Sequence, residues 1–87
     1  MSTVFQPRWF SMPDGSALYA LEAPDRLVEH QRIGSRHAVH ELVATTHPDR
    51  LRIADLIEGA TAGHLLELDA DEYERRRVDM ASTPRIG

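Results

Sequence analysis

Two segments rich in β-compatible side chains flank a turn signal near the N-terminus. Val4–Ser11 and Ala17–Glu22 carry most of the aromatic residues, and a Pro-Asp-Gly-Ser sequence at 13–16 separates them. Proline sets φ at the first central turn position, aspartate bonds its own backbone, and glycine accepts a left-handed conformation. The pattern predicts an N-terminal β-hairpin with a Gly-containing loop. Because Pro7 cannot donate a ladder hydrogen bond, we expect the first strand at a sheet edge or with a bulge.

From residue 24 onward the apolar positions follow a helical period. Six of them lie on one face of a 3.6-residue helix, and the stripe keeps its phase through Gly34 and Ser35: Leu27, Val28, Ala38, Val39, Leu42 and Val43. A glycine inside a helix costs about 1 kcal/mol relative to alanine, whereas a serine can cap a new helix. Residues 25–47 are therefore predicted to form one long helix or two coaxial helices, and the pattern leaves that choice open.

A further helix signal begins with His-Pro-Asp at 47–49. Proline is tolerated at the first helical position, and an acid suits the positive end of the helix dipole. The predicted helix covers about Pro48–Glu58 and ends at Gly59 or Gly63. Apolar residues occupy most of its circumference, so we expect it to be the central buried helix: Leu51, Ile53, Ala54, Leu56 and Ile57.

The pattern in residues 64–80 predicts a short strand and a C-terminal helix. The strand-like run lies at 64–68, and Asp69 and Glu72 occupy the N-cap and N3 positions of a capping box. The helix is expected to reach Met80, and residues 81–87 are expected to form a frayed tail.

Together these elements predict an α+β fold in a single domain spanning residues 1–80. An N-terminal β-hairpin and a short third strand form one small sheet, which two to three central helices and a C-terminal helix pack against. A chain of 87 residues buries about 60–65% of its unfolded surface, so a partner subunit is one way to add buried area. We therefore expect self-association, with a homodimer as its simplest form.

Composition narrows the class of protein further. The chain has no cysteine, which excludes disulfides and thiolate chemistry and favours an intracellular setting. Signal-peptide and membrane-span patterns are lacking, so a cytoplasmic protein is expected. All ten basic residues are arginine, and both lysine and asparagine are missing, which points to a GC-rich bacterial or phage genome. With a net charge of −4, nucleic acid is not expected as a partner.

Histidines give the first candidate chemistry. His37 and His40 are three residues apart with Glu41 adjacent, and such a spacing on a helix can chelate a metal ion. On a continuous helix, however, His30, His37 and Glu41 share a meridian opposite the apolar stripe and face water. The favoured interpretation is a solvated polar face with no metal or cofactor. A small His-based metal-binding protein and a pH-sensitive interface remain as alternatives.

Catalytic patterns are missing from the sequence. It lacks a G-x-S-x-G elbow, a G-x-G-x-x-G loop and a Walker-type loop. The acids at the start of the last helix are explained by capping: Asp69, Asp71 and Glu72. We therefore expect no enzyme activity.

The arginine run at 75–77 is the one basic cluster that could touch phosphates. Asp71 and Glu72 can pair with Arg75 and Arg76 at i, i+4, which leaves a single guanidinium unpaired. Residues 47–53 resemble the start of the helix that opens the helix-turn-helix of arsenic-repressor-type winged-helix regulators. That family continues with a turn and a recognition helix, whereas a strand-like segment follows here. A DNA-binding regulator is therefore the alternative function.

Aromatic residues of the hairpin are the predicted partner-binding residues, together with one arginine. Trp9 and Phe10 are neighbours in a strand and point to opposite faces, so one of them is expected to face a partner. The predicted contact set is Arg8, Trp9, Phe10 and Tyr19, a composition enriched at protein interfaces. The predicted function is a small non-enzymatic protein-binding module: an inhibitor, an antitoxin-like or anti-CRISPR-like factor, or a subunit adaptor.

Overall fold

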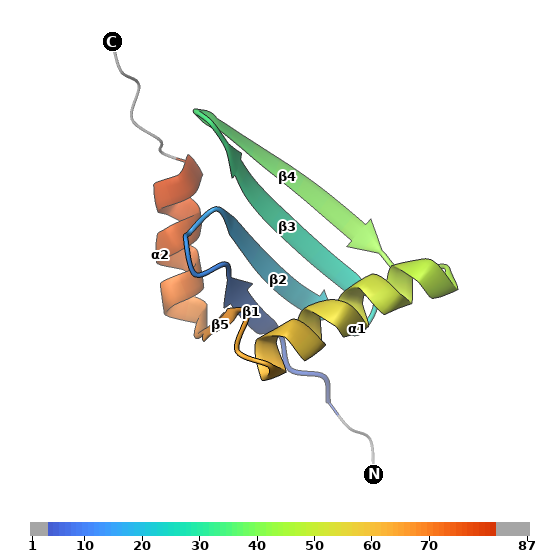
Figure 1. Cartoon of the computed structure of the whole chain (residues 1–87). Helices are drawn as coiled ribbons and strands as arrows, with labels where there is room; N and C mark the ends of the chain where they lie inside the picture. Colours follow the sequence, from blue (N-terminus) through green and yellow to red (C-terminus); the bar gives the residue numbers. More distant parts are fainter. Residues whose placement is uncertain (1–3, 82–87) are drawn as a thin grey trace.

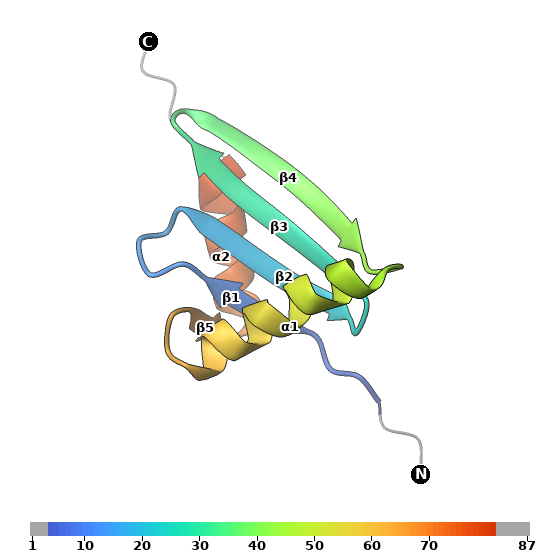
Figure 2. The same cartoon turned by 45° about the vertical axis from the view of Figure 1, so that its right-hand side comes forward.

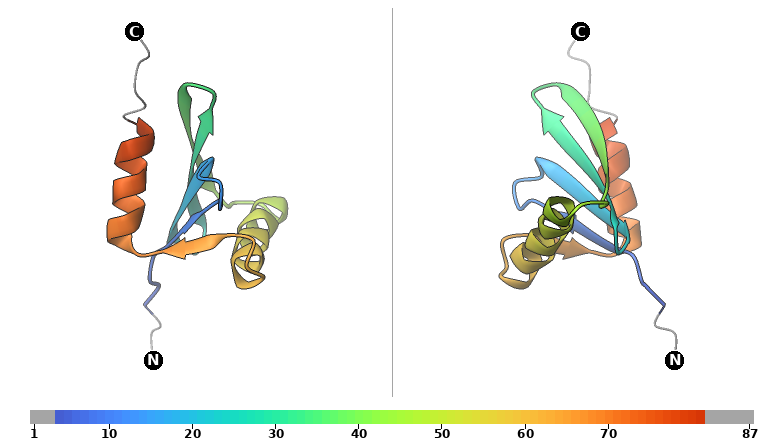
Figure 3. Two further views of the ribbon diagram at one scale, coloured as in Figure 1. Left: turned by 60° about the vertical axis from the view of Figure 1, so that its left-hand side comes forward. Right: turned by 90° about the vertical axis from the view of Figure 1, so that its right-hand side faces the viewer.

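A computed structural model describes residues 4–81 of the chain as a five-stranded antiparallel sheet with one helix on each side (Figures 1 and 3). Its elements in chain order are β1 (Arg8–Ser11), β2 (Ala17–Ala23), β3 (Arg26–Ile33), β4 (Arg36–Val43), α1 (His47–Thr61), β5 (Leu66–Leu68) and α2 (Ala70–Ala81). The strand order across the sheet is β4-β3-β2-β1-β5, so the first four strands form a meander and β5 joins beside β1. The predicted α+β class is confirmed.

The predicted N-terminal hairpin is confirmed as β1 and β2, which pair antiparallel with Trp9 opposite Ala20. In the loop, Gly15 has a φ of 77°, and the Asp14 carboxylate accepts the Ser16 amide at 2.9 Å. The expected edge position of the first strand is wrong, because β1 pairs with β2 on one side and β5 on the other. Pro7 lies immediately before the strand, so its missing N–H does not interrupt the ladder.

The segment 25–47 is the largest correction, because residues 26–43 form a β-hairpin in place of the predicted helices. β3 and β4 pair along their whole length, from Arg26 opposite Val43 to Ile33 opposite Arg36. The turn consists of Gly34 and Ser35, and Gly34 alone takes a positive φ, 63°. This is the backbone of a type II′ turn, whose twist matches that of two paired strands.

Helix α1 covers one face of the sheet and does not lie at the centre of the molecule. Thr46 caps its N-terminus, as its hydroxyl accepts the Asp49 amide, and Gly63 follows its C-terminus with a φ of 85°. Ile53 is its one fully buried residue, whereas Leu51 is 49% exposed. Ile53 packs with residues on the sheet face beneath it: Phe10, Leu21, Leu27 and Ala44. Among the described residues there is thus one central helix rather than two or three.

Helix α2 covers the opposite face of the sheet, over β1 and β2 (Figure 3). Its buried residues Tyr73 and Met80 pack on Leu18 and Ala20 of β2. As predicted, Asp69 caps this helix, and its carboxylate accepts the Glu72 amide at 2.7 Å. The predicted tail at 81–87 lies outside the described residues, apart from the last residue of α2.

The two sheet faces therefore carry separate cores, and Phe10 anchors the larger one. We expect Phe10→Ala to lower the free energy of unfolding by about 3–5 kcal/mol, since the side chain is completely buried. Val4→Ala is the control, because Val4 is 79% exposed and its truncation should change stability by less than about 0.5 kcal/mol. Urea denaturation measures both variants. A Phe10→Ala cost as small as that of the control would contradict the proposed core.

Candidate functional site

Three hydrogen-bonded polar side chains lie in a row across the α2 face of the sheet. His30 of β3 is 6% exposed and lies between His37 of β4 and Tyr73 of α2. Its Nδ1 is 3.0 Å from Nε2 of His37, and its Nε2 is 2.9 Å from the Tyr73 hydroxyl. The two imidazoles are nearly parallel, with ring centroids 5.2 Å apart. These contacts tie α2 to β3 and β4, and we call the three residues the His30 cluster.

The hydrogen bonds of the His30 cluster have a preferred direction. A buried tyrosine hydroxyl needs an acceptor for its proton, and His30 Nε2 is the acceptor found for Tyr73 within the described residues. Neutral His30 then carries its proton on Nδ1 and donates to Nε2 of His37. Neutral His37 in turn carries its proton on Nδ1. The series of hydrogen bonds therefore ends on β4 with an N–H donor.

Burial lowers the pKa of His30 below its ordinary value, and the nearby His37 and Arg77 lower it further. The carboxylates of Glu22 and Glu74 act in the opposite direction but more weakly. Burial also raises the pKa of the Tyr73 hydroxyl. Both shifts favour the neutral forms, which the directional hydrogen bonds require.

The predicted position of these histidines in water is wrong for His30. On a helix the seven-residue spacing of His30 and His37 gives a shared meridian, whereas in the hairpin it gives a diagonal contact across two strands. Glu41 lies on the same face as His37, but the strand places His40 on the opposite face. The predicted ligand set is therefore not brought together. Within residues 4–81 no group of three or more histidines and acids is arranged to hold a metal ion.

The outer edge of β4 is the second candidate site (Figures 1 and 2). The Ala44 amide donates across the pair to Asp25, and the direction of backbone groups alternates along an antiparallel strand. Even-numbered residues of β4 therefore bond to β3. The N–H and C=O groups of the odd-numbered residues point outward, away from the sheet: His37, Val39, Glu41 and Val43. No strand of the described residues pairs with that side.

Side chains of the same four residues line the α2 face of the open edge. Val39 and Val43 are 54% and 47% exposed, so both offer apolar surface beside the open backbone. Between them, Glu41 accepts a hydrogen bond from Arg26 at 2.8 Å. β5 forms the other edge of the sheet, but it has three residues and leads directly into α2. We call the odd-numbered face and outward backbone of β4 the β4 edge.

The four predicted partner-binding residues lie around β1 rather than on a free edge. Arg8 makes a two-point ion pair with Glu67 of β5, at 2.9 Å for each bond, and stacks over the Phe10 ring. Trp9 is half-buried against Tyr73, and Phe10 is completely buried. Trp9 and Phe10 do point to opposite faces, but each face has its own covering helix. A partner-binding role for this set stays a prediction.

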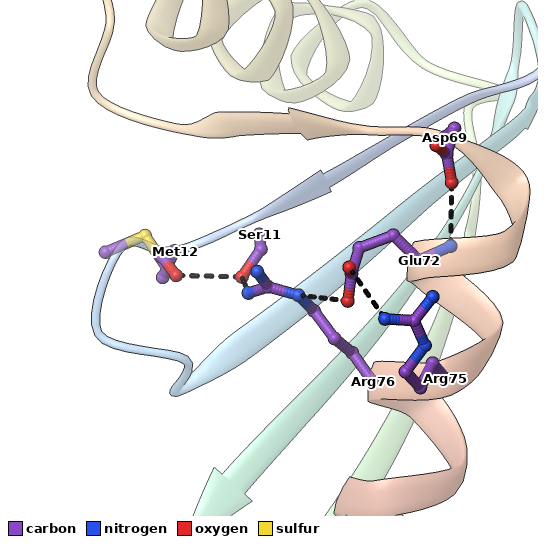
Figure 4. A network of polar contacts seen from close by, with 6 residues as sticks. All are labelled: Ser11, Met12, Asp69, Glu72, Arg75 and Arg76. Atoms are coloured by element: carbon purple, nitrogen blue, oxygen red, sulfur yellow. Dashed lines mark hydrogen bonds and ion pairs between the residues drawn. The ribbon is translucent and has the colours of Figure 1, made fainter.

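All three arginines of the 75–77 run have acidic partners, which corrects the expected unpaired guanidinium. Glu72 accepts from both Arg75 and Arg76, and Arg77 pairs with Glu74. Arg76 also donates to the buried hydroxyl of Ser11 at 3.3 Å (Figure 4). A cavity of about 350 Å³ adjoins this network, and two arginines and two aspartates line it. Its formal charges cancel, so it lacks the excess of positive charge that phosphate sites use.

Comparisons with protein families, curated proteins and solved structures find no match to this chain. Neither helix of the described residues is long and apolar enough to cross a membrane.

The lowered pKa of His30 predicts a pH-dependent stability. Below about pH 6.5 the unfolded chain gains a proton on His30 that the folded chain does not bind. The free energy of unfolding should fall from about pH 6.5 as the pH drops toward the lowered pKa of the folded state. Above about pH 6.5, His30 is neutral in both states and its contribution should stay constant.

His30→Gln should flatten this acid limb while costing about 1–3 kcal/mol at neutral pH, because it removes a buried hydrogen-bonding group. Urea denaturation at a series of pH values measures both effects. His64→Gln changes an exposed histidine outside the cluster and is the matched control. An acid limb as steep in His30→Gln as in the wild type would exclude His30 as its source.

Adjacent prolines test the alternation on β4. Ala38→Pro removes an amide that bonds to β3, so it should lower the free energy of unfolding by about 1–3 kcal/mol. Val39→Pro removes an outward amide and should cost clearly less. Thermal and urea melts of the two variants give the comparison. Equal costs, or the reverse order, would show that the outward groups are misassigned.

Proposed function

We propose that this protein is a small non-enzymatic binding module that recognises an extended polypeptide segment by strand addition at the β4 edge. The observation that supports this most is the length and regularity of the edge. β4 has eight residues and pairs with β3 without a register shift. An open strand of this kind is a ready template for another chain, and main-chain hydrogen bonds supply the affinity.

Three of the devices that block an edge strand are missing from β4. It contains no proline and no bulge, and no helix runs along its outer side in the described structure (Figures 1 and 2). By contrast, the edge at β5 is short, and its Glu67 is occupied by Arg8. The contrast between the two edges supports a role for β4 in binding.

Alternate side chains of β4 supply specificity in this proposal. Val39 and Val43 offer apolar contacts, while His37 and Glu41 offer a hydrogen-bond donor and a carboxylate on the same face. A bound strand is thus expected to present apolar and complementary polar residues in alternation. In a GC-rich bacterium or its phage, such a module would act as an inhibitor, an antitoxin-like or anti-CRISPR-like factor, or a subunit adaptor.

The alternative functions have less support from the geometry. A DNA-binding regulator would need a basic face, whereas the net charge is −4 and the three arginines of α2 all pair with acids. A histidine metal site would need His37 and His40 on one face of their element, and a strand separates them.

Peptides selected from a displayed random library test strand addition directly. Peptides that bind the dilute protein should slow hydrogen exchange at the outward amides of Val39 and Glu41. Val39→Pro removes one of these amides and should weaken binding by about tenfold or more, which corresponds to about 1.4 kcal/mol. Val39→Thr keeps the amide and the β-branched shape, so it is the matched control and should bind comparably. Selected peptides that bind Val39→Pro as tightly as the wild type would contradict the proposal.

A further inference from the structure

We propose that the occupant of the β4 edge is a second copy of this chain, paired antiparallel across a two-fold axis at Val39. This inference rests on the proposed strand addition and names its partner. The two sheets would then continue into one another through β4 of each copy. The argument uses the symmetry of the edge, the pairing of its side chains and the direction of hydrogen bonds in the His30 cluster.

Symmetry limits the registers that are available. A two-fold axis perpendicular to the sheet keeps every residue on its own face, so residues on the same face must lie opposite each other. An axis at Val39 places Val39 opposite its own copy and His37 opposite Glu41 of the second copy. The outward N–H and C=O groups of these residues then meet as hydrogen-bonded pairs, and the bonds from β4 to β3 are untouched.

Neighbouring registers are less favourable. An axis at Glu41 places two carboxylates directly opposite each other, and like charges in that position are destabilising. An axis at His40 places Val39 opposite a carboxylate, which leaves the apolar surface of Val39 without an apolar neighbour. The axis at Val39 avoids both problems, because it places each His37 opposite a Glu41 and covers the 54% exposed valine with its own copy.

The His30 cluster supplies a donor for this pairing. Hydrogen bonds run from Tyr73 through His30 to Nε2 of His37, which leaves the Nδ1–H of His37 without an acceptor within the described residues. In the register centred on Val39, that donor lies across from the Glu41 carboxylate of the second copy. Arg26 bonds to this carboxylate in its own chain at 2.8 Å, which directs the acceptor to the α2 face of the β4 edge.

Single cysteine variants test the register, since the chain has no cysteine of its own. In the proposed dimer, residue 39 lies about 5.5 Å from its copy between Cα atoms, within the disulfide range of about 4.4–6.8 Å. Residue 41 lies four positions out of register with its copy, about 13 Å away along the strand. Val39→Cys should therefore form a disulfide-linked dimer under mild oxidation at least about tenfold faster than Glu41→Cys, whose Cα atoms are too far apart for a disulfide.

His40→Cys is the matched control for the neighbouring register, because an axis at His40 would make it the fastest of the three variants. Non-reducing electrophoresis gives the rates, and circular dichroism checks that each variant is folded. Equal rates for all three variants, or fastest linkage by His40→Cys or Glu41→Cys, would overturn the register.

Analytical ultracentrifugation of the unmodified protein tests self-association without any variant. The proposal expects the fraction of dimer to rise with concentration. A strictly monomeric protein across the accessible concentrations would overturn the inference. Peptide binding at the β4 edge by that same monomer would leave the proposed function intact, whereas loss of both would remove the two together.

Discussion

Pairing of β3 with β4 is the interaction on which the rest of the structure depends. The two-residue turn at Gly34 and Ser35 folds the chain back on itself, and Gly34 supplies the positive φ that this turn requires. The fold-back brings His37 against His30 and makes β4 the last strand of the sheet. It also delivers the chain to Thr46, where α1 begins over the opposite face.

Two short helices cannot cover both faces of a five-stranded sheet. α1 crosses one face and α2 lies over β1 and β2 on the other (Figure 3). On the α2 face of the outermost strand β4, Val39 and Val43 stay about half exposed. A small domain buries a limited share of its surface, so the uncovered strand is where additional burial can still be gained. The His30 cluster links α2 to β3 and β4 through hydrogen bonds.

Elements with local signals could be predicted from the sequence. The Pro-Asp-Gly-Ser loop and the cap at Asp69 depend on residues within a few positions, and both are found as expected. The end of α1 lies at the second of the two glycines that the sequence offered, Gly63. For the segment that forms β3 and β4, the prediction of helices is wrong because its apolar positions fit both a helical period and the pairing of two strands. Leu27 and Leu42 share a helical face by spacing, yet they also face each other across the two strands. The Gly-Ser dipeptide was the signal that could have decided between them.

The candidate site could not be predicted, because it depends on contacts between distant segments. His30 meets Tyr73 across 43 positions of the chain, and nothing near either residue indicates this contact. The open edge is likewise a property of strand order, which follows from β5 joining β1 rather than β4. Burial of Phe10 and half-burial of Trp9 also depend on which helix covers each face.

Residue-resolved hydrogen exchange along β4, at low and high protein concentration, tests the account most directly. At low concentration, the amides of Ala38, His40 and Leu42 should be protected, while those of Val39 and Glu41 exchange freely. At high concentration, Val39 and Glu41 should become protected as the β4 edge is filled. Uniformly fast exchange through residues 36–43 would contradict the strand. Protection of Val39 and Glu41 that does not depend on concentration would contradict the open edge.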